Sequence, residues 1–168
     1  MLSIAFKEWA AICEALANGR QKLILRKGGI HEDGGTFRPE HARFWLYPTH
    51  FHEQQQAGIK PEAQTFLEAA EANRPPTGFV WLTHFVEVAD VQFCRSLDEV
   101  LKLDAEHIWS EVTVRQRFAY RTPGLYVFRV NTFRATAPAE IPEDPDYAGC
   151  KTWVPLKGGL STAGAVML

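Results

Sequence analysis

The chain has 168 residues, 46% of them hydrophobic and 23% charged, which is enough for one domain with a sizeable core. Its net charge of −2 excludes a generally basic nucleic-acid coat and leaves room only for a local basic patch. The three cysteines, Cys13, Cys94 and Cys150, lie far apart without a C-x-x-C pair, so neither a disulfide framework nor a zinc knuckle is expected. We predict one domain over residues 1–156 and a flexible tail at 157–168.

Periodicity and turn chemistry predict an alternation of helices and strands. Asn18-Gly19 is a helix stop, Pro48 places its strand at an edge or bulge, and Ser96 with Glu99 forms a capping box. The expected elements, in chain order, are helix 4–17, strand 22–26, loop 28–35, strand 44–50, helix 61–73, strand 79–93 with a break at Ala89-Asp90, a short helix from Ser96, strand 112–118, strand 125–133 closing a hairpin with it, loop 135–146, and a strand or return segment at 150–156.

These elements predict an α+β fold, in which a curved, mostly antiparallel sheet or small β-barrel carries flanking helices. The N-terminal stretch has charges at Lys7, Glu8 and Glu14 inside its apolar run, as a signal peptide would not. No run of about 18 apolar residues occurs, so no membrane span is expected. We therefore expect a cytoplasmic protein without a membrane partner.

The segment from Arg20 to His52 concentrates cations, four of the six histidines, and aromatic rings. Such a mixture suits a polyanion with exposed bases, and it equally suits a solvated strand face. Our main interpretation is a nucleic-acid-binding module for RNA or single-stranded DNA, without catalysis and without a cofactor. The residues expected to contact phosphates are Arg20, Lys22, Arg26, Lys27 and Arg43, and those expected to stack on a base are Trp45 and Tyr47.

Two alternative functions remain open at this point. His50 and His52 would point to the same side of a strand and form two ligands of a metal site in a hydrolase or nuclease. A third ligand would have to come from elsewhere, with His31, His41 and His84 as candidates, and without one we expect no stoichiometric metal. The second alternative is a protein-interaction domain. No Asp/Glu-x-Lys or G-x-S-x-G motif supports a specific reaction.

The segment ALANGRQKLILRKGG resembles the start of PUA-like domains of the ASCH and EVE groups. Those domains open with a helix, a glycine, a basic residue and a strand, followed by an arginine, and Gly19 and Arg26 occupy the corresponding positions here. The resemblance implies a PUA-like barrel with a pocket for RNA or a modified base. Gln21 and Ile24 depart from the lysine and the acidic residue of that pattern, which puts amidohydrolase-type chemistry in doubt.

Over the whole chain, the patterns LILRKGGI and FWLYPTHFHEQ resemble a bacterial family defined as domain of unknown function 1802. This second resemblance is the more specific of the two, and it implies no particular activity.

Overall fold

The computed structural model describes residues 1–28, 30–34, 36–149 and 151–168, and the side chains of Glu32, Asp33 and His52 are not described. The strands are β1 (Leu2–Trp9), β2 (Leu23–Arg26), β3 (Ile30–Asp33), β4 (Thr36–Pro39), β5 (Arg43–Thr49), β6 (Phe79–Cys94), β7 (Leu125–Pro142), β8 (Trp153–Leu160) and β9 (Val166–Met167). The α-helices are α1 (Ala10–Ala17), α2 (His52–Gly58), α3 (Gln64–Ala72), α4 (Leu97–Leu101) and α5 (Glu111–Ala119), and short 3-10 turns lie at Pro61–Ala63, Asp104–Glu106 and Pro145–Tyr147.

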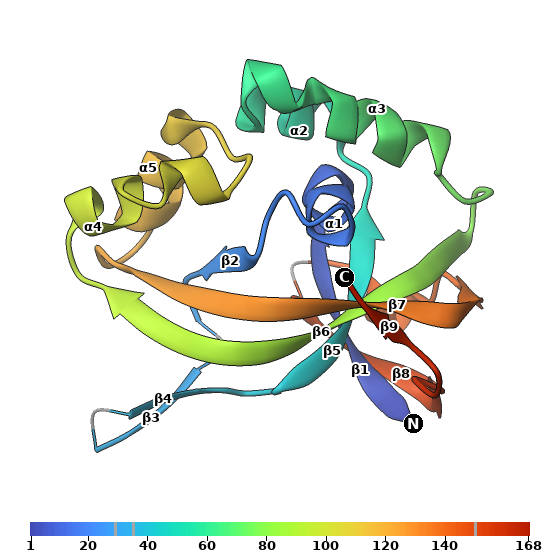
Figure 1. Cartoon of the computed structure of the whole chain (residues 1–168). Coiled ribbons are helices and arrows are strands. Elements are labelled where there is room, and N and C mark those ends of the chain that lie inside the picture. The colour runs from blue at the N-terminus through green and yellow to red at the C-terminus, as the bar shows by residue number, and fades with distance from the viewer. Residues whose placement is uncertain (29, 35, 150) are drawn as a thin grey trace.

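Seven of the described strands form one curved sheet in the order β2-β7-β6-β5-β1-β8, with β9 added beside β7. Its pairs are antiparallel except for β1 with β5, so the predicted α+β class and mostly antiparallel sheet are confirmed. The pairing follows an open path that begins at β2 and ends at β8. Strands β3 and β4 form a separate hairpin in the segment expected to be a loop. Figure 1 shows the helices gathered over one face of the sheet and the hairpin below the other.

Strands β6 and β7 form a long curved ribbon that crosses the whole molecule (Figure 1). One register shift lies between Val88 and Asp90, at the break that the sequence predicts. A second shift lies between the register pairs Leu82↔Ala139 and His84↔Arg134. Pro138 falls in this irregularity, where the ladder does not need an N–H from it.

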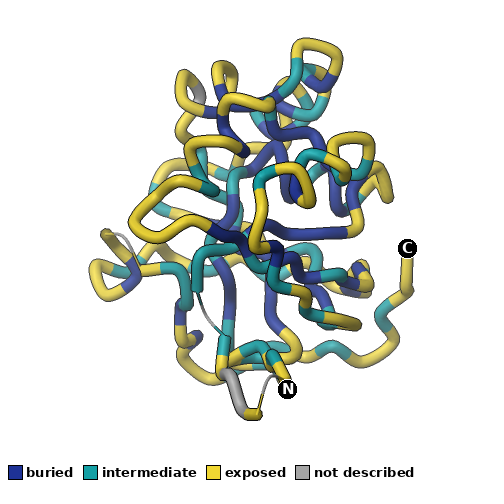
Figure 2. Tube along the Cα trace, turned by 90° about the vertical axis from the view of Figure 1, so that its left-hand side faces the viewer, coloured by how far each residue is buried: buried dark blue, intermediate teal, exposed yellow. Residues whose placement is uncertain are grey.

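The apolar core is divided into two clusters. The larger cluster lies between the helices and the sheet and includes Phe6, Leu16 and Trp109, whereas the smaller includes Trp45 and Phe85. In Figure 2 the buried parts of the trace run through the interior, and the exposed parts form the outer loops and both chain ends.

The predicted helix 4–17 is wrong in its first half, because residues Leu2–Trp9 form β1. This strand pairs in parallel with β5 and antiparallel with β8, so its backbone groups are satisfied on both sides. Tertiary pairing therefore overrides the helical spacing of the apolar residues. Only Ala10–Ala17 form α1, and Gly19 then adopts a positive φ of 77° at the predicted helix stop.

The predicted strand 112–118, and with it the hairpin 112–133, is also wrong, because Glu111–Ala119 form α5. The hydroxyl of Ser110 accepts a hydrogen bond from the Thr113 N–H at 3.3 Å and caps this helix. Its two valines lie on opposite sides, with Val112 63% exposed and Val114 buried. The valines that alternate with polar residues, a pattern that indicates a strand, therefore lie on two faces of a helix.

Two segments expected to be irregular belong to the sheet. Strand β7 continues through the predicted loop 135–146 as far as Pro142, which faces Phe79 of β6. Residues 157–168, expected to form a flexible tail, contain the end of β8 and the short strand β9. The predicted capping box of Ser96 and Glu99 is present at α4. No helix in the described part of the chain has the length and apolarity that a membrane crossing requires.

Candidate functional site

A cleft of about 1630 Å³ is lined in part by the end of α3 and by the connection from α3 to β6. This connection lies at the right of Figure 1. Its walls come from the ends of β1 and β5, from α1, from residues 73–78, from the first half of β6 and from the second half of β7. A cleft of this size is large enough for a nucleotide or a similar small molecule.

Exposed aromatic rings line this cleft. Phe79 and Trp81 are 40% and 36% exposed, whereas Val80 and Leu82 between and after them are buried. Side chains of a strand alternate between its faces, so Phe79 and Trp81 share one face of β6. Phe51 contributes a third ring and is 61% exposed. Large rings left open to solvent in a cleft are available for stacking on a planar ligand.

One cation of the cleft has no protein partner among the described residues. Lys7 donates hydrogen bonds to the carbonyl oxygens of Tyr147 and Gly149, and Arg74 lies 3.5 Å from the carboxylate of Glu71. The side chain of Arg134, in contrast, is exposed and makes no hydrogen bond or ion pair with any described residue. Its guanidinium is therefore free to contact an anionic or polar ligand.

His84 and Tyr47 are neutral groups on the cleft wall. Burial and the nearby Arg134 lower the pKa of His84 to about 4, so its imidazole is uncharged at neutral pH. Its Nδ1 lies 2.8 Å from the Thr83 hydroxyl, which restricts the orientation of the ring. Burial and the nearby Glu143 raise the pKa of Tyr47 to about 12, so its phenol keeps its proton. Neutral donors and acceptors of this kind suit an uncharged ligand surface such as a base edge.

Carboxylates also line the cleft. Glu140 accepts a hydrogen bond from the indole Nε1 of Trp81 at 2.7 Å, and Asp144 forms an ion pair with Lys157. Glu143 also lines the cleft. The cleft is therefore not a uniformly basic groove, and a highly charged polyanion does not match it along its whole length.

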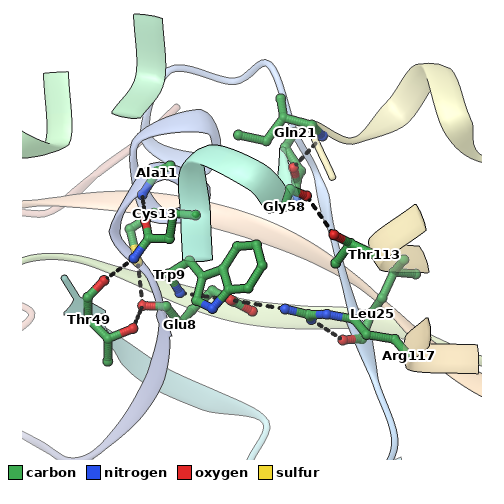
Figure 3. A network of polar contacts seen from close by, with 12 residues as sticks. Glu8, Trp9, Ala11, Cys13, Gln21, Leu25, Thr49, Gly58, Thr113 and Arg117 are labelled. Atoms are coloured by element: carbon green, nitrogen blue, oxygen red, sulfur yellow. Dashed lines mark hydrogen bonds and ion pairs between the residues drawn. The ribbon is translucent and has the colours of Figure 1, made fainter. Parts of the chain in front are cut away.

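A polar network supports the back of the cleft, where β1 passes into α1 (Figure 3). The buried Gln55 accepts a hydrogen bond from the Ala11 N–H and donates one to the carbonyl of Thr49. The hydroxyl of Thr49 donates to the carbonyl of Glu8 at 3.0 Å. Because Thr49 lines the cleft, this network fixes the position of its wall.

Most of the cations predicted to contact phosphate are engaged within the protein. Arg20 donates to the carbonyl of Ala105 at 2.9 Å, and Lys27 donates to three carbonyls of the segment 118–124. Of the five predicted cations, only Lys22 is exposed without a side-chain hydrogen bond or ion pair to a described residue.

The two other predicted cations are packed against aromatic rings. The guanidinium of Arg26 lies 4.4 Å from the ring centre of Phe6, and burial lowers its pKa to about 10. Arg43 forms a 2.8 Å ion pair with Glu87 and lies over the ring of Phe85. The predicted phosphate-binding residues therefore do not form one surface, and none of them lines the cleft.

The two aromatic residues predicted to stack on a base differ in their positions. Trp45 is fully buried, and its indole Nε1 donates to the carbonyl of Leu2 at 3.3 Å. Stacking of Trp45 on a ligand is therefore ruled out by its burial in the smaller core cluster. Tyr47 does line the cleft, although only 6% of it is exposed.

The predicted histidine pair does not lie on one strand. Strand β5 ends at Thr49, and His52 is the first residue of α2, with its side chain outside the described part. His50 lines the cleft, with its Nδ1 3.6 Å from the carboxylate of Glu71. Burial, followed by Arg74, lowers the pKa of His50.

The candidate third ligands are dispersed. His31 lies on the β3–β4 hairpin, His41 packs against Trp153, and His84 lies in the cleft. Among the side chains that are described, no three histidine, cysteine or acidic groups are arranged to hold a metal. Cys13 and Cys94 are free and buried, and Cys150 lies outside the described residues.

Three residues that make the cleft distinctive were not predicted from the sequence, namely Phe79, Trp81 and Arg134. The strand was predicted, but Phe79, Val80, Trp81 and Leu82 are all apolar, so the sequence did not indicate which of them would be exposed. Arg134 followed a predicted strand end, so nothing in the sequence placed it opposite His84.

The curved, mostly antiparallel sheet with helices over one face defines an α+β domain, and solved ASCH structures share this fold. ASCH from Zymomonas mobilis matches this chain with a TM-score of 0.51 at 14% sequence identity, covering 92% of this chain and 87% of that chain. Two single-substitution variants of the same protein match with TM-scores of 0.52 and 0.51 at 14% and 13% identity, covering 92% of this chain and 88% and 90% of theirs. At such low identity the likeness concerns the fold alone.

The chain belongs to the family described as Domain of unknown function (DUF1802), whose model matches residues 5–167. Both predicted resemblances are thereby confirmed. No curated protein matches the chain in sequence.

Proposed function

We propose that this protein binds single-stranded RNA and that one base stacks on the aromatic wall of the cleft. The observation that carries the proposal is the exposure of Phe79 and Trp81 on one face of β6, inside the cleft. Stacking on an aromatic ring contributes roughly 1–3 kcal/mol per base and tolerates any base, since every base has a π-face.

The charge of the cleft supports the same ligand class. Arg134 offers a free guanidinium for a phosphate, and His84 and Tyr47 offer neutral polar groups for a base edge. The PUA-like fold is consistent with this proposal, which moves the expected interface from the segment 20–52 to the cleft.

Fluorescence anisotropy with a labelled single-stranded RNA of mixed sequence tests the proposal. At about 50 mM salt we expect a dissociation constant in the micromolar range, as for nonspecific sites with few phosphate contacts. Trp81→Ala is expected to weaken binding by roughly 5- to 150-fold. The control is Tyr120→Ala, which removes an exposed ring that does not line the cleft and is expected to leave binding unchanged.

Two results would overturn the proposal. Absence of binding at tens of micromolar protein would show that RNA is not a ligand of this protein. Equal affinities of wild type and Trp81→Ala would show that any binding occurs outside the cleft.

A further inference from the structure

We infer that the cleft accepts one nucleotide unit with a single phosphate, either a free nucleoside monophosphate or the phosphorylated end of a strand. The inference rests on the proposed function, because it uses the same aromatic wall, and it narrows the ligand from RNA in general to one nucleotide. The interior of a longer strand, with phosphates on both sides of each base, does not match the distribution of charge in the cleft.

The cleft offers one cation whose side chain is free to bind a phosphate. Of the three cations in the cleft, Lys7 is held by main-chain carbonyls and Arg74 lies beside Glu71. Only the side chain of Arg134 makes no hydrogen bond or ion pair within the described part of the chain. One free guanidinium, with its planar fork of donors, matches one phosphate.

The aromatic ring, the carboxylate and the free cation follow a fixed order along the β6–β7 ribbon. Trp81 faces Glu140 in the register, and His84 faces Arg134. Trp81 and Arg134 are therefore separated by about three strand positions, roughly 10 Å at about 3.3 Å per residue. A base on Trp81 has the Glu140 carboxylate beside it and the free cation further along the ribbon.

The carboxylates of the cleft oppose a second phosphate. Glu140 is held against the Trp81 indole by a 2.7 Å hydrogen bond, so it cannot swing away without breaking that bond. Glu143 and Asp144 line the cleft as well. A second phosphate, on the side of the nucleotide away from Arg134, would approach these carboxylates. Like charges at short range oppose binding. The polarity of the cleft therefore orients the phosphate toward Arg134 and limits the ligand to one.

Isothermal titration with adenosine, AMP and adenosine 3′,5′-bisphosphate tests this inference, because the bisphosphate carries a phosphate on each side of the nucleoside as the interior of a strand does. AMP is expected to bind roughly tenfold more tightly than adenosine, because it adds one charge-assisted contact, and more tightly than the bisphosphate. Arg134→Gln should abolish the difference between AMP and adenosine. Glu140→Gln, whose amide oxygen can still accept from Trp81, should improve the affinity for the bisphosphate relative to AMP. Arg115→Gln, on the exposed side of α5, is the control and should change none of these ratios.

RNA oligonucleotides distinguish the free nucleotide from the strand end. If a strand end is the natural ligand, a 5′- or 3′-phosphorylated heptamer should displace AMP at lower concentration than an unphosphorylated one, with a salt slope of roughly −0.7 for one contact. Equal displacement by AMP and by a phosphorylated heptamer would indicate a free nucleotide, and both outcomes support the single-phosphate site.

Different results would contradict the proposed RNA binding and the single-phosphate site. RNA binding that depends on Trp81, combined with equal affinities for adenosine and AMP or tighter binding of the bisphosphate than of AMP, would overturn the single-phosphate site and leave the proposed function standing. If neither RNA nor any nucleotide binds, the proposed function is wrong and this inference falls with it.

Discussion

The indole Nε1 of Trp81 donates a 2.7 Å hydrogen bond to Glu140, its register partner on β7. The bond holds an exposed ring in one orientation at the wall of the cleft. A ring fixed before the ligand arrives loses less side-chain entropy on binding than a mobile one. The pair therefore combines a stacking surface with a charge that restricts what can lie beyond it.

The ring and its hydrogen bond can be separated by substitution. Trp81→Phe keeps an aromatic face but removes the indole N–H, so we expect it to retain RNA affinity to within roughly tenfold, whereas Trp81→Ala loses the stacking contribution of roughly 1–3 kcal/mol. Anisotropy titrations of both variants measure the difference. Equal losses in the two variants would indicate that the hydrogen bond, and not the ring face, determines binding.

Arg117 of α5 is predicted to stabilise the fold. Its guanidinium lies 5.1 Å from the ring centre of Trp9 and 4.8 Å from that of Trp109, and its nearest carboxylate is the buried Glu8 at 4.0 Å. Arg117→Ala removes both ring contacts and the cation beside Glu8. We expect it to lower the free energy of unfolding by roughly 3 kcal/mol, measured by urea denaturation.

The same helix provides a matched control for Arg117. Arg115 forms a solvent-exposed ion pair with Glu111 one turn away, and such pairs contribute little. Arg115→Ala is expected to change the free energy of unfolding by less than about 0.5 kcal/mol. Similar effects of the two substitutions would contradict the role assigned to the Arg117 cluster.

His107 is predicted to make stability depend on pH. It is 1% exposed, and burial, followed by the nearby Lys60, lowers its pKa to about 4. Between pH 6.5 and 4 the unfolded chain takes up a proton that the folded protein does not, so stability falls as the pH falls. The loss attributable to His107 is roughly 2 kcal/mol at pH 5.

Denaturation curves at pH 7 and pH 5 for wild type and His107→Gln test this dependence. The variant is expected to lose less stability between the two pH values than wild type, whatever its stability at pH 7. An identical loss in both proteins would show that other groups account for the pH dependence.

Gly58 is predicted to tolerate no side chain. A Cβ at this position would lie 2.4 Å from an atom of the Trp9 ring, and the Gly58 carbonyl accepts a hydrogen bond from the Thr113 hydroxyl. Gly58→Ala should therefore destabilise the protein by roughly 1–3 kcal/mol through overpacking, measured by thermal unfolding. Gly28→Ala meets nothing within 4 Å and is expected to be nearly neutral, so equal shifts would contradict the packing argument.

The parts of the fold that could be predicted were those with unambiguous local signals. The capping box at Ser96 and the break at Ala89-Asp90 are both present. The errors at β1 and α5 arose where two periods coincide, because Phe6 fits a helical stripe but lies on a strand, and Val112 alternates with Val114 but lies on a helix. Which period applies was decided by pairing with β5 and β8 and by the Ser110 cap.

The candidate site was less predictable, because it depends on exposure and not on residue type. Trp45 lies among charges in the sequence, yet its side chain is buried, whereas Trp81 lies among apolar residues and is exposed. Similarly, Lys27 is used to hold carbonyls of the segment 118–124, a role that depends on a turn distant in the sequence. The ligand class is a proposal that starts from the sequence, and the fold determines which residues are exposed and available to test it.

The most direct test is the indole region of a ¹H–¹⁵N correlation spectrum recorded during titration with single-stranded RNA. We expect the Trp81 Nε1–H resonance to shift progressively and saturate, because a base would stack on its ring, and the signals of the buried Trp45 and Trp109 to remain in place. Assignment of the Trp81 signal by Trp81→Phe completes the measurement. An unchanged Trp81 signal at saturating RNA would contradict base stacking in the cleft.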